Sequence, residues 1–268
     1  MIKWSSVLIL WILACSFYVQ AQDLDVPYVS TPQQVVEGML DAADVGPGDY
    51  VIDLGSGDGR IVIAAAKRGA AGHGVDLNPV RVEEAEKNAI DSGVSDRVMF
   101  FIGDLFESDF SQASVVTLYL LTSVNRDLRP QLFEQLEPGT KVVSHAFGMG
   151  SWEPDKHISI DNRNIYYWII PASVEGNWKW ITDGIHYEMT ATQEFQKVSA
   201  TIGTGGNELR IEQFDLRGDR VNIIAENRQS GNRFVFSGKV NENMMTGSVQ
   251  IRNQNEKKIT PWTATRNL

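Results

Sequence analysis

The chain of 268 residues contains a single cysteine, Cys15, and only four histidines. Cys15 lies in an apolar N-terminal stretch. If that stretch is cleaved after Ala21, the remaining chain has no disulfide, no thiolate nucleophile and no cysteine metal ligand. His73, His157 and His186 lack the spacing of metal ligands, so we expect no metal site. Basic residues are also scarce, since 24 Lys and Arg stand against 34 Asp and Glu.

The shortage of positive charge is confined to one part of the chain. Residues 23–173 hold 11 Lys and Arg against 23 Asp and Glu, a net charge of −12, whereas residues 174–268 hold 12 against 11. Long nucleic acids need a basic track for their phosphates, so we expect no nucleic-acid partner for the acidic part. A basic peptide or a cationic small molecule is compatible with it.

The first residues, MIKWSSVLILWILACSFYVQA, carry one early positive charge, Lys3, and no charge from Trp4 to Ala21. This pattern is typical of a secretory signal peptide over residues 1–21, with Val19–Ala21 as its cleavage site. An uncleaved N-terminal anchor is the alternative, and ILAC, which ends at Cys15, resembles a lipobox. We therefore expect export or membrane association through this segment, with an anchored domain facing the cytoplasm as the alternative.

Strand and helix patterns alternate between residues 22 and 173. They follow a first helix that we expect Ser30 or Thr31 to cap and the turn at Gly46 to end. We predict strands at 50–54, 74–76, 97–104, 114–120 and 140–147, helices at 60–68, 79–92 and 126–139, and a closing strand pair within 157–172. The helix at 126–139 would carry its proline in the first turns. This alternation predicts an α/β fold with a Rossmann-like, doubly wound parallel sheet, which binds ligands at the carboxyl ends of its strands.

Helical periodicity stops near Val174, and short alternating runs separated by Gly, Asn, Asp and Ser follow to the end of the chain. They predict a small antiparallel β domain over residues 174–268, either a meander or a part-open barrel. We find no catalytic cluster in it. Trp178, Trp180 and Trp262 form either a binding surface or, as is commoner for tryptophan in such a domain, its core and closure.

A glycine-rich turn, LGSGDGR, follows the first predicted strand, and its Gly55, Gly57 and Gly59 allow backbone to approach a ligand closely. A dinucleotide fingerprint needs glycine where this chain has Arg60. Asp58 lies inside the turn and would repel a pyrophosphate by about 1–4 kcal/mol per charge pair. The turn thus favours S-adenosylmethionine, a ligand with sulfonium and ammonium charges and no phosphate.

Three further acids follow strand ends in the same part of the chain. Asp53 precedes the turn, where the methionine part of such a ligand would lie. Asp76 ends the second strand and can accept hydrogen bonds from both ribose hydroxyls. Asp104 follows the third strand and can accept from the adenine amino group. Each acid alone is compatible with a solvated turn residue, but four at successive strand ends favour a cofactor site.

The motifs VIDLGSGDGR, GVDLNP and GDLF resemble those of class I S-adenosylmethionine-dependent methyltransferases. YVSTP, VVTLYLLTSVN and LRPQLFEQLEPGTKVVSHAF resemble one branch more closely. This branch comprises the small membrane-associated protein-lysine methyltransferases that act on the c-ring protein of ATP synthase or the adenine nucleotide translocase. The resemblance covers residues 27–168. It implies S-adenosylmethionine as the cofactor and these contacts for it: Tyr28, Thr31, Asp53, Gly55, Ser56, Gly57, Asp58, Gly59, Asp76, Leu77, Asp104 and Leu105.

The acceptor side is less defined. No NPPY or DPPY motif follows the fourth strand, which disfavours methylation of adenine N6 or of a glutamine amide. Three residues are candidates for catalysis, each with a structural alternative. Tyr119 orients an amine or is a half-buried strand residue. His145 is a general base or substrate contact, or a hydrogen-bonded structural residue. Asn125 binds substrate or caps a helix.

The leading hypothesis is methyl transfer to an amine, above all a protein lysine. A small-molecule methyltransferase is the second interpretation. A third is an exported, non-catalytic protein in which a Rossmann-like domain serves as a scaffold and the β domain binds a partner.

Overall fold

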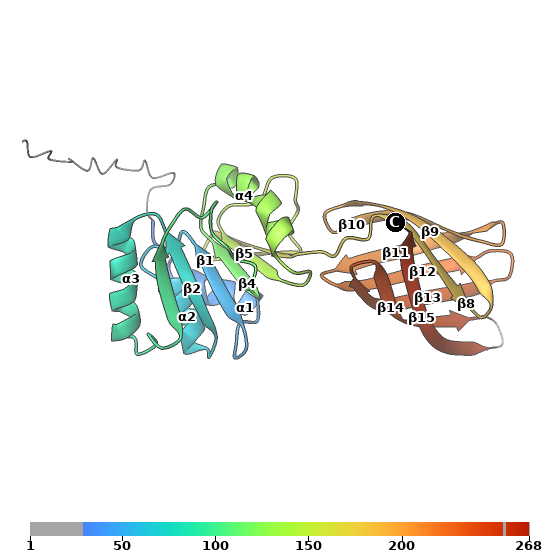
Figure 1. Cartoon of the computed structure of the whole chain (residues 1–268), viewed down its shortest axis with the longest axis horizontal. Coiled ribbons are helices and arrows are strands. Elements are labelled where there is room, and N and C mark those ends of the chain that lie inside the picture. Colours follow the sequence, from blue (N-terminus) through green and yellow to red (C-terminus); the bar gives the residue numbers. More distant parts are fainter. Residues whose placement is uncertain (1–28, 254–255, 268) are drawn as a thin grey trace, which may run out of the picture.

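The computed structural model describes residues 29–253 and 256–267, in which two parts of the chain lie end to end (Figure 1). The first is an α/β domain from α1 (Gln33–Ala42) to β7 (Arg163–Ile169), and the second is a β-barrel that begins at β8 (Gly176–Thr182). The predicted leader over residues 1–21 lies outside the described residues, as does Tyr28. Within the described chain, no helix is long and apolar enough to cross a membrane.

The α/β domain is built on a seven-stranded sheet with the order β3-β2-β1-β4-β5-β7-β6. The strands before β7 are β1 Tyr50–Leu54, β2 Ala71–Asp76, β3 Val98–Ile102, β4 Val115–Leu118, β5 Lys141–His145 and β6 Lys156–Ile160. The first five are parallel, and β7 pairs antiparallel with both β5 and β6. The order reverses between β1 and β4, which places a crevice at their carboxyl ends. The predicted doubly wound sheet with a closing strand pair is confirmed.

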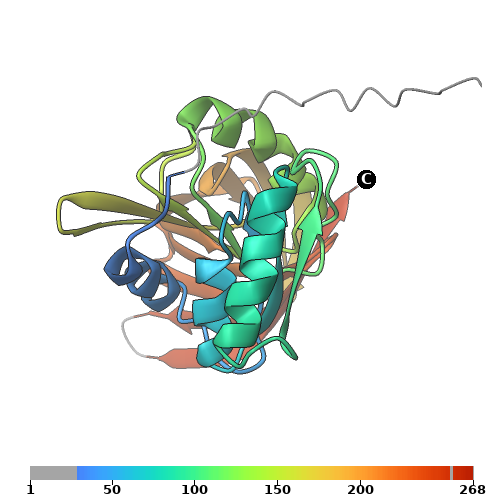
Figure 2. The same cartoon turned by 90° about the vertical axis from the view of Figure 1, so that its left-hand side faces the viewer.

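Helices cover both faces of this sheet. α1, α2 (Arg60–Lys67) and α3 (Pro79–Asp91) pack on one face, whereas α4 (Thr122–Gln135) buries Leu128 and Leu132 against the other. Figure 2 shows α1, α2 and α3 side by side and α4 apart from them. A sheet covered on both faces needs apolar side chains on both, which explains the unbroken apolar runs in β1 and β4.

The N-terminus of α1 differs from the prediction. The helix starts after Pro32 without a side-chain cap, and it ends at Ala42, before the expected Gly46. The Thr31 hydroxyl bonds the His145 ring instead, at 3.1 Å, so it is not available as a cap. A tertiary contact has replaced the local one.

α4 also differs, because it begins at Thr122, four residues before the predicted start. Pro130 consequently lies inside the helix and not in its first turns. A proline in that position removes one backbone hydrogen bond. The helix continues through it because Leu128 and Leu132 on either side are fully buried.

The second part of the chain is a closed barrel with the strand order β10-β11-β12-β13-β14-β15-β8-β9. The strands after β8 are β9 Ile185–Glu194, β10 Lys197–Thr204, β11 Asn207–Arg217, β12 Arg220–Asn227, β13 Asn232–Asn241, β14 Met244–Arg252 and β15 Lys257–Asn267. The expected meander is right, but the part-open alternative is wrong. β15 pairs with β8 through Thr265 and Lys179, which removes both free edges of the sheet.

The barrel interior is filled by aromatic rings. Trp178, Trp180 and Trp262 are at most 4% exposed, so the interpretation as core residues is confirmed. The Phe236 ring lies 5.2 Å from Trp262 and 5.5 Å from Trp180, measured between ring centroids. Barrels of eight strands have an interior just wide enough for side chains to fill.

This packing predicts a large cost for opening a hole in the barrel. Phe236→Ala should lower the free energy of unfolding by about 3–5 kcal/mol, because a fully buried ring is removed from among other rings. Urea unfolding followed by tryptophan fluorescence measures the loss. Ile259→Ala, at a position 64% exposed on β15, is the control and should change it by less than about 0.5 kcal/mol. Equal effects of the two variants would contradict a packed interior.

Candidate active site

A cavity of about 330 Å³ opens at the crevice between β1 and β4. Ten of the residues singled out from the sequence line it: Thr31, Asp53, Gly55, Ser56, Asp58, Asp76, Leu77, Asp104, Leu105 and Tyr119. The structure thus brings together residues that lie up to 88 positions apart in the chain. Gly57, Gly59, Asn125 and His145 are not among the described lining residues, and Tyr28 lies outside the described chain.

The glycine-rich turn is held by the neighbouring strand. The amides of Gly55 and Ser56 both donate to the carbonyl of Val75, at 2.8 and 2.9 Å. Gly55, Gly57 and Gly59 have φ values of 83°, 54° and 77°, a left-handed conformation that side chains disfavour. The Ser56 hydroxyl is buried beside the cavity and has no hydrogen-bond partner within the described chain. A buried hydroxyl without a partner is costly, so it fits a polar ligand group there.

Asp76 connects this turn to α3. Its Oδ2 accepts from the Gly57 amide at 2.8 Å, and its Oδ1 accepts from the Asn78 amide at 2.9 Å. Asn78 in turn caps α3 by accepting from the Val80 amide, as predicted. Each carboxylate oxygen has two acceptor positions. Asp76 is therefore fixed in orientation and keeps capacity to accept from a ligand in the cavity.

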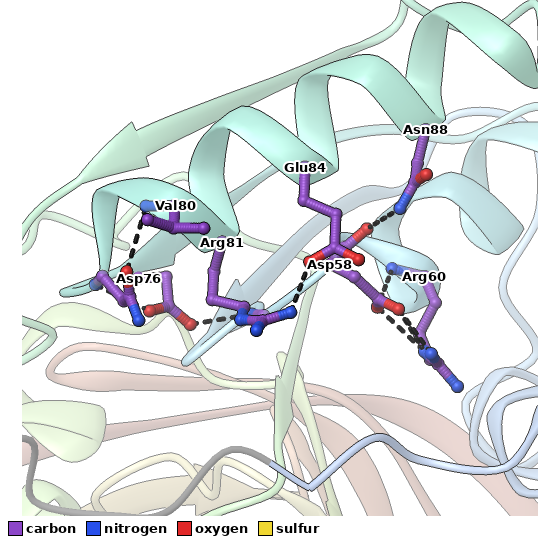
Figure 3. Close-up of polar contacts among 9 residues, drawn as sticks. Asp58, Arg60, Asp76, Val80, Arg81, Glu84 and Asn88 are labelled. Carbon is purple, nitrogen blue, oxygen red and sulfur yellow. Dashed lines mark hydrogen bonds and ion pairs between the residues drawn. The ribbon is translucent and has the colours of Figure 1, made fainter.

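Asp58 does not act alone in the turn. Arg60 Nε donates to its Oδ1 at 2.8 Å and Arg60 Nη2 pairs with its Oδ2, while Asn88 donates to its backbone carbonyl at 3.0 Å (Figure 3). Its negative charge is therefore shared with Arg60, a pairing that the sequence argument did not consider. Arg60 also donates to the Thr31 carbonyl at 2.8 Å, so the ion pair fixes the segment before α1 against the turn.

Asp53 is the most perturbed acid of the site. It is 2% exposed, and its carboxylate accepts from the Thr117 hydroxyl at 2.7 Å. Burial raises the pKa of Asp53 to about 7, and the charges of Asp76 and Asp58 add to this effect, which the Thr117 bond opposes. A cationic group in the cavity would favour the ionised carboxylate.

Asp104 lies at the third strand end. Its Oδ1 accepts from the Phe106 amide at 2.8 Å, which closes a tight turn after β3. Leu77 and Leu105 line the cavity close to it in the sequence, with apolar side chains. A polar acceptor between apolar walls is a combination that recognises a flat ring with an amino group.

The other end of the cavity is aromatic. The Tyr119 ring lies 3.9 Å from the His145 ring and 6.0 Å from the Phe147 ring, and Tyr119 and Phe147 line the cavity. His145 is 2% exposed and bonds Thr31 through Nδ1. Burial lowers the pKa of His145 to about 4, with a smaller contribution from Arg163, so its ring is neutral at physiological pH. His145 supports Tyr119 from behind.

Asn125 is also placed behind the cavity wall. It is fully buried, and its Nδ2 donates to the Ser144 hydroxyl at 3.2 Å and to the Phe147 carbonyl at 3.2 Å. Of the three catalytic candidates, only Tyr119 lines the cavity.

Sequence reasoning missed several lining residues, including Leu121, Val124 and Phe147. Phe147 follows the carboxyl end of β5, the same kind of position as Asp53 and Asp76, and this signal was available. Leu121 and Val124 have no such signal, because they line the cavity only through the earlier start of α4.

In the described chain, no group of three or more His, Cys, Asp and Glu residues could hold a metal ion.

Comparison with known proteins agrees with this geometry. The profile of the ANTKMT methyltransferase domain matches residues 53–156. A protein-lysine N-methyltransferase of Saccharolobus islandicus is 45% identical over 54% of this chain and 94% of its own length. The chain belongs to the ANTKMT methyltransferase family. The human lysine N-methyltransferase that is named for the c-ring protein of ATP synthase is 31% identical over 61% of this chain and 69% of its own length.

A solved structure supports the cofactor of this ANTKMT family member. An RNA methyltransferase from Salinibacter ruber, in complex with S-adenosyl-L-homocysteine, is 56% identical with a TM-score of 0.54. The match covers 55% of this chain and 96% of that one. The protein is an S-adenosylmethionine-dependent methyltransferase. Its residues fit that cofactor, because the partnerless Ser56 hydroxyl, the fixed Asp76 and the buried Asp53 offer acceptors for hydroxyl and cationic groups. The family match ends at residue 156, before the barrel begins at Gly176.

Loss of the Asp76 carboxylate should weaken cofactor binding. Asp76→Ala should reduce the affinity for S-adenosylmethionine by about 1.5–3 kcal/mol, the scale of charge-assisted hydrogen bonds. Isothermal titration calorimetry measures this change. Glu83→Ala, an exposed position on α3, is the matched acidic control and should bind as the parent does. If the Asp76 variant kept full affinity, the ribose contact would lie elsewhere.

The pKa of Asp53 predicts a pH-dependent affinity. If Asp53 faces a cationic group of the cofactor, that group binds the ionised carboxylate, which is the minor form at pH 6 and the major form at pH 8. The affinity for S-adenosylhomocysteine, whose ammonium is charged across this range, should therefore rise about tenfold from pH 6 to pH 8. Calorimetry at the two pH values tests this. Asp53→Asn should lack the dependence, and a variant as pH-sensitive as the parent would assign the titration to another group.

Proposed function

We propose that this ANTKMT-family enzyme methylates the side-chain amine of a protein lysine. The observation that carries the proposal is the aromatic and apolar end of the cavity. Tyr119, Phe147, Leu121 and Val124 line it, and the neutral His145 stands behind Tyr119. A lysine side chain is an aliphatic stem with an amine at its tip, and this surface suits the stem.

These residues also suit the amine. The bound cofactor supplies the electrophilic methyl group. A lysine amine must lose its proton before it attacks, and an apolar wall favours the neutral amine by lowering its pKa. The Tyr119 ring and hydroxyl orient the amine, and positioning of this kind contributes several kcal/mol to a displacement reaction. His145, with a pKa of about 4, orients Tyr119 and does not hold the proton at neutral pH.

The names of the relatives support a protein acceptor. The archaeal and human relatives are both named as lysine N-methyltransferases, and the name of the human one gives a protein of ATP synthase as its substrate. Charge supports a protein acceptor as well, since residues 23–173 have a net charge of −12, which attracts a basic segment of a partner.

RNA is the second candidate, because the solved relative is named as an RNA methyltransferase. Electrostatics disfavour it. The two cationic residues that line the cavity, Arg60 and Arg81, form ion pairs with Asp58 and Glu84 (Figure 3). RNA binding draws its affinity from basic residues along the phosphate backbone.

Product analysis decides between the two. The purified enzyme is incubated with methyl-tritiated S-adenosylmethionine and the separated protein and RNA fractions of its source cells. We expect label in protein, recovered after acid hydrolysis as methylated lysine. Label recovered as methylated nucleosides would overturn the proposal in favour of RNA.

Two variants test whether Tyr119 acts on the acceptor. Tyr119→Ala should lower kcat about 100-fold while leaving the affinity for S-adenosylhomocysteine unchanged, because it removes positioning and not cofactor binding. Tyr119→Phe is the matched control that retains the ring. If it has the activity of the parent, the ring face orients the amine; if it falls with the alanine variant, the hydroxyl does so.

A further inference from the structure

The β9–β10 hairpin of the barrel inserts an aromatic ring into the α/β domain. Phe195 lies at its turn, 5.7 Å from the Phe133 ring and 6.0 Å from the Trp152 ring. The guanidinium of Arg129 lies 4.9 Å over the Phe195 ring, a cation–π contact. Phe195 has a φ of 56°, a conformation disfavoured for a bulky residue. Such strain persists where the surroundings fix it, so the direction of this ring is imposed by its contacts.

The next residue adds directional hydrogen bonds. The Gln196 Oε1 accepts from the Trp152 indole at 2.9 Å, and its Nε2 donates to the Glu153 carbonyl at 2.8 Å. Trp152 is 1% exposed, so its indole N–H would lose a needed partner without Gln196. The hairpin therefore holds both the side chain of Trp152 and the backbone beside it.

The residues that the hairpin contacts lead back to the cavity. Asn125, Arg129 and Phe133 follow one another at four-residue intervals along α4, which puts them on neighbouring turns of one side of the helix. Arg129 donates to the Met149 carbonyl at 2.9 Å, and Asn125 donates to the Phe147 carbonyl at 3.2 Å. The helix thus holds the segment 147–152 at two points, and the hairpin holds the same segment at Trp152.

This segment begins in a strained turn. Ala146 has a φ of 64°, and the Phe147 amide donates to the His145 carbonyl at 2.8 Å, which closes a three-residue turn of a rare and strained class. The Ser144 hydroxyl donates to the Phe147 carbonyl at 2.7 Å. A turn of this kind needs outside contacts to persist, and it places Phe147 in the cavity wall.

The cofactor end is held differently. Gly55 and Ser56 are fixed by Val75, and Gly57 is fixed by Asp76, all within the β1–β2 part of the sheet. These bonds come from strands on the far side of β4 from α4 and the barrel.

We propose that Phe195 and Gln196 are positioning residues for methyl transfer: through Trp152, Arg129 and α4 they hold the 147–152 segment, and so the acceptor wall at Phe147. The barrel is therefore a support for the acceptor side that leaves cofactor affinity unaffected. The assignment of that wall to the acceptor rests on the proposed function, whereas the mechanical coupling does not.

The test uses the full chain with matched variants. Phe195→Gly removes the ring and suits the left-handed backbone, so the hairpin itself can still turn. Gln196→Ala removes the two hydrogen bonds, and Phe195→Tyr restores the ring. The control is Asp183→Gly in the β8–β9 turn, where φ is 52°. Consecutive hairpins turn at opposite ends of a barrel, so this site lies away from the α/β domain.

Hydrogen exchange and cofactor binding give the primary result. We expect amide exchange in residues 147–153 to be at least about tenfold faster in Phe195→Gly and Gln196→Ala, because the local opening of that segment becomes easier. Phe195→Tyr and Asp183→Gly should exchange as the parent does. The affinity for S-adenosylhomocysteine should stay within about twofold in all four variants. Unchanged exchange in 147–153 would overturn the proposal, as would a loss of cofactor affinity that matches the change in exchange.

A kinetic split tests the consequence for transfer. With the lysine acceptor, Phe195→Gly should lower kcat/KM for the acceptor at least about fivefold while KM for S-adenosylmethionine is kept, and Phe195→Tyr should recover it. An equal fall for both substrates would overturn a role specific to the acceptor side. If no lysine acceptor is found, the proposed function fails, and the exchange and affinity measurements still decide whether the hairpin supports the segment.

Discussion

The site depends on one backbone arrangement, the pair of hydrogen bonds from the Gly55 and Ser56 amides to the Val75 carbonyl. They turn the chain sharply at the carboxyl end of β1 and join it to β2. Because the turn uses left-handed glycines, α2 can start immediately after it, and the crevice stays free of backbone. Asp53 before the turn and Asp76 at the end of β2 are brought to one cavity by this connection. The carboxylates at the cofactor end are thus placed by main-chain geometry.

The acceptor end has a different origin of order. Its wall follows a strained turn at Ala146, which has a side chain where the β1 turn has glycine. The contacts that fix it come from α4 and, through Trp152, from the barrel. A site with one end fixed by the sheet and the other by added elements can vary its acceptor while it keeps its cofactor. The family match agrees with this division, because it ends at residue 156 and leaves the barrel out.

Much of the fold followed from the sequence, since period and turn chemistry are local signals. β1 was predicted residue for residue, and Asn78 was correctly assigned as a cap. The failures involve tertiary contacts. Thr31 bonds His145 in place of capping α1, Asp58 pairs with Arg60, and the burial of α4 carries the helix through Pro130. Barrel closure depends on pairing β15 with β8, strands about 80 residues apart, and no local pattern reports that.

The raised pKa of Asp53 gives the cofactor end a further property. A buried carboxyl with a folded pKa of about 7 and an unfolded pKa near 3.8 binds its proton more tightly in the folded protein. This contribution to stability is complete below the unfolded pKa and is lost as the pH rises through the folded pKa, so the ligand-free protein loses it between about pH 4 and pH 7. Thr117 limits the loss by bonding the carboxylate. A cation that binds beside Asp53 favours the ionised form, which an uncharged or anionic ligand does not. The destabilised carboxylate thus selects for positive charge, and the cofactor of this family carries a sulfonium and an ammonium. Discrimination against phosphate-bearing dinucleotides therefore rests on burial of Asp53, while the charge of Asp58 is already shared with Arg60.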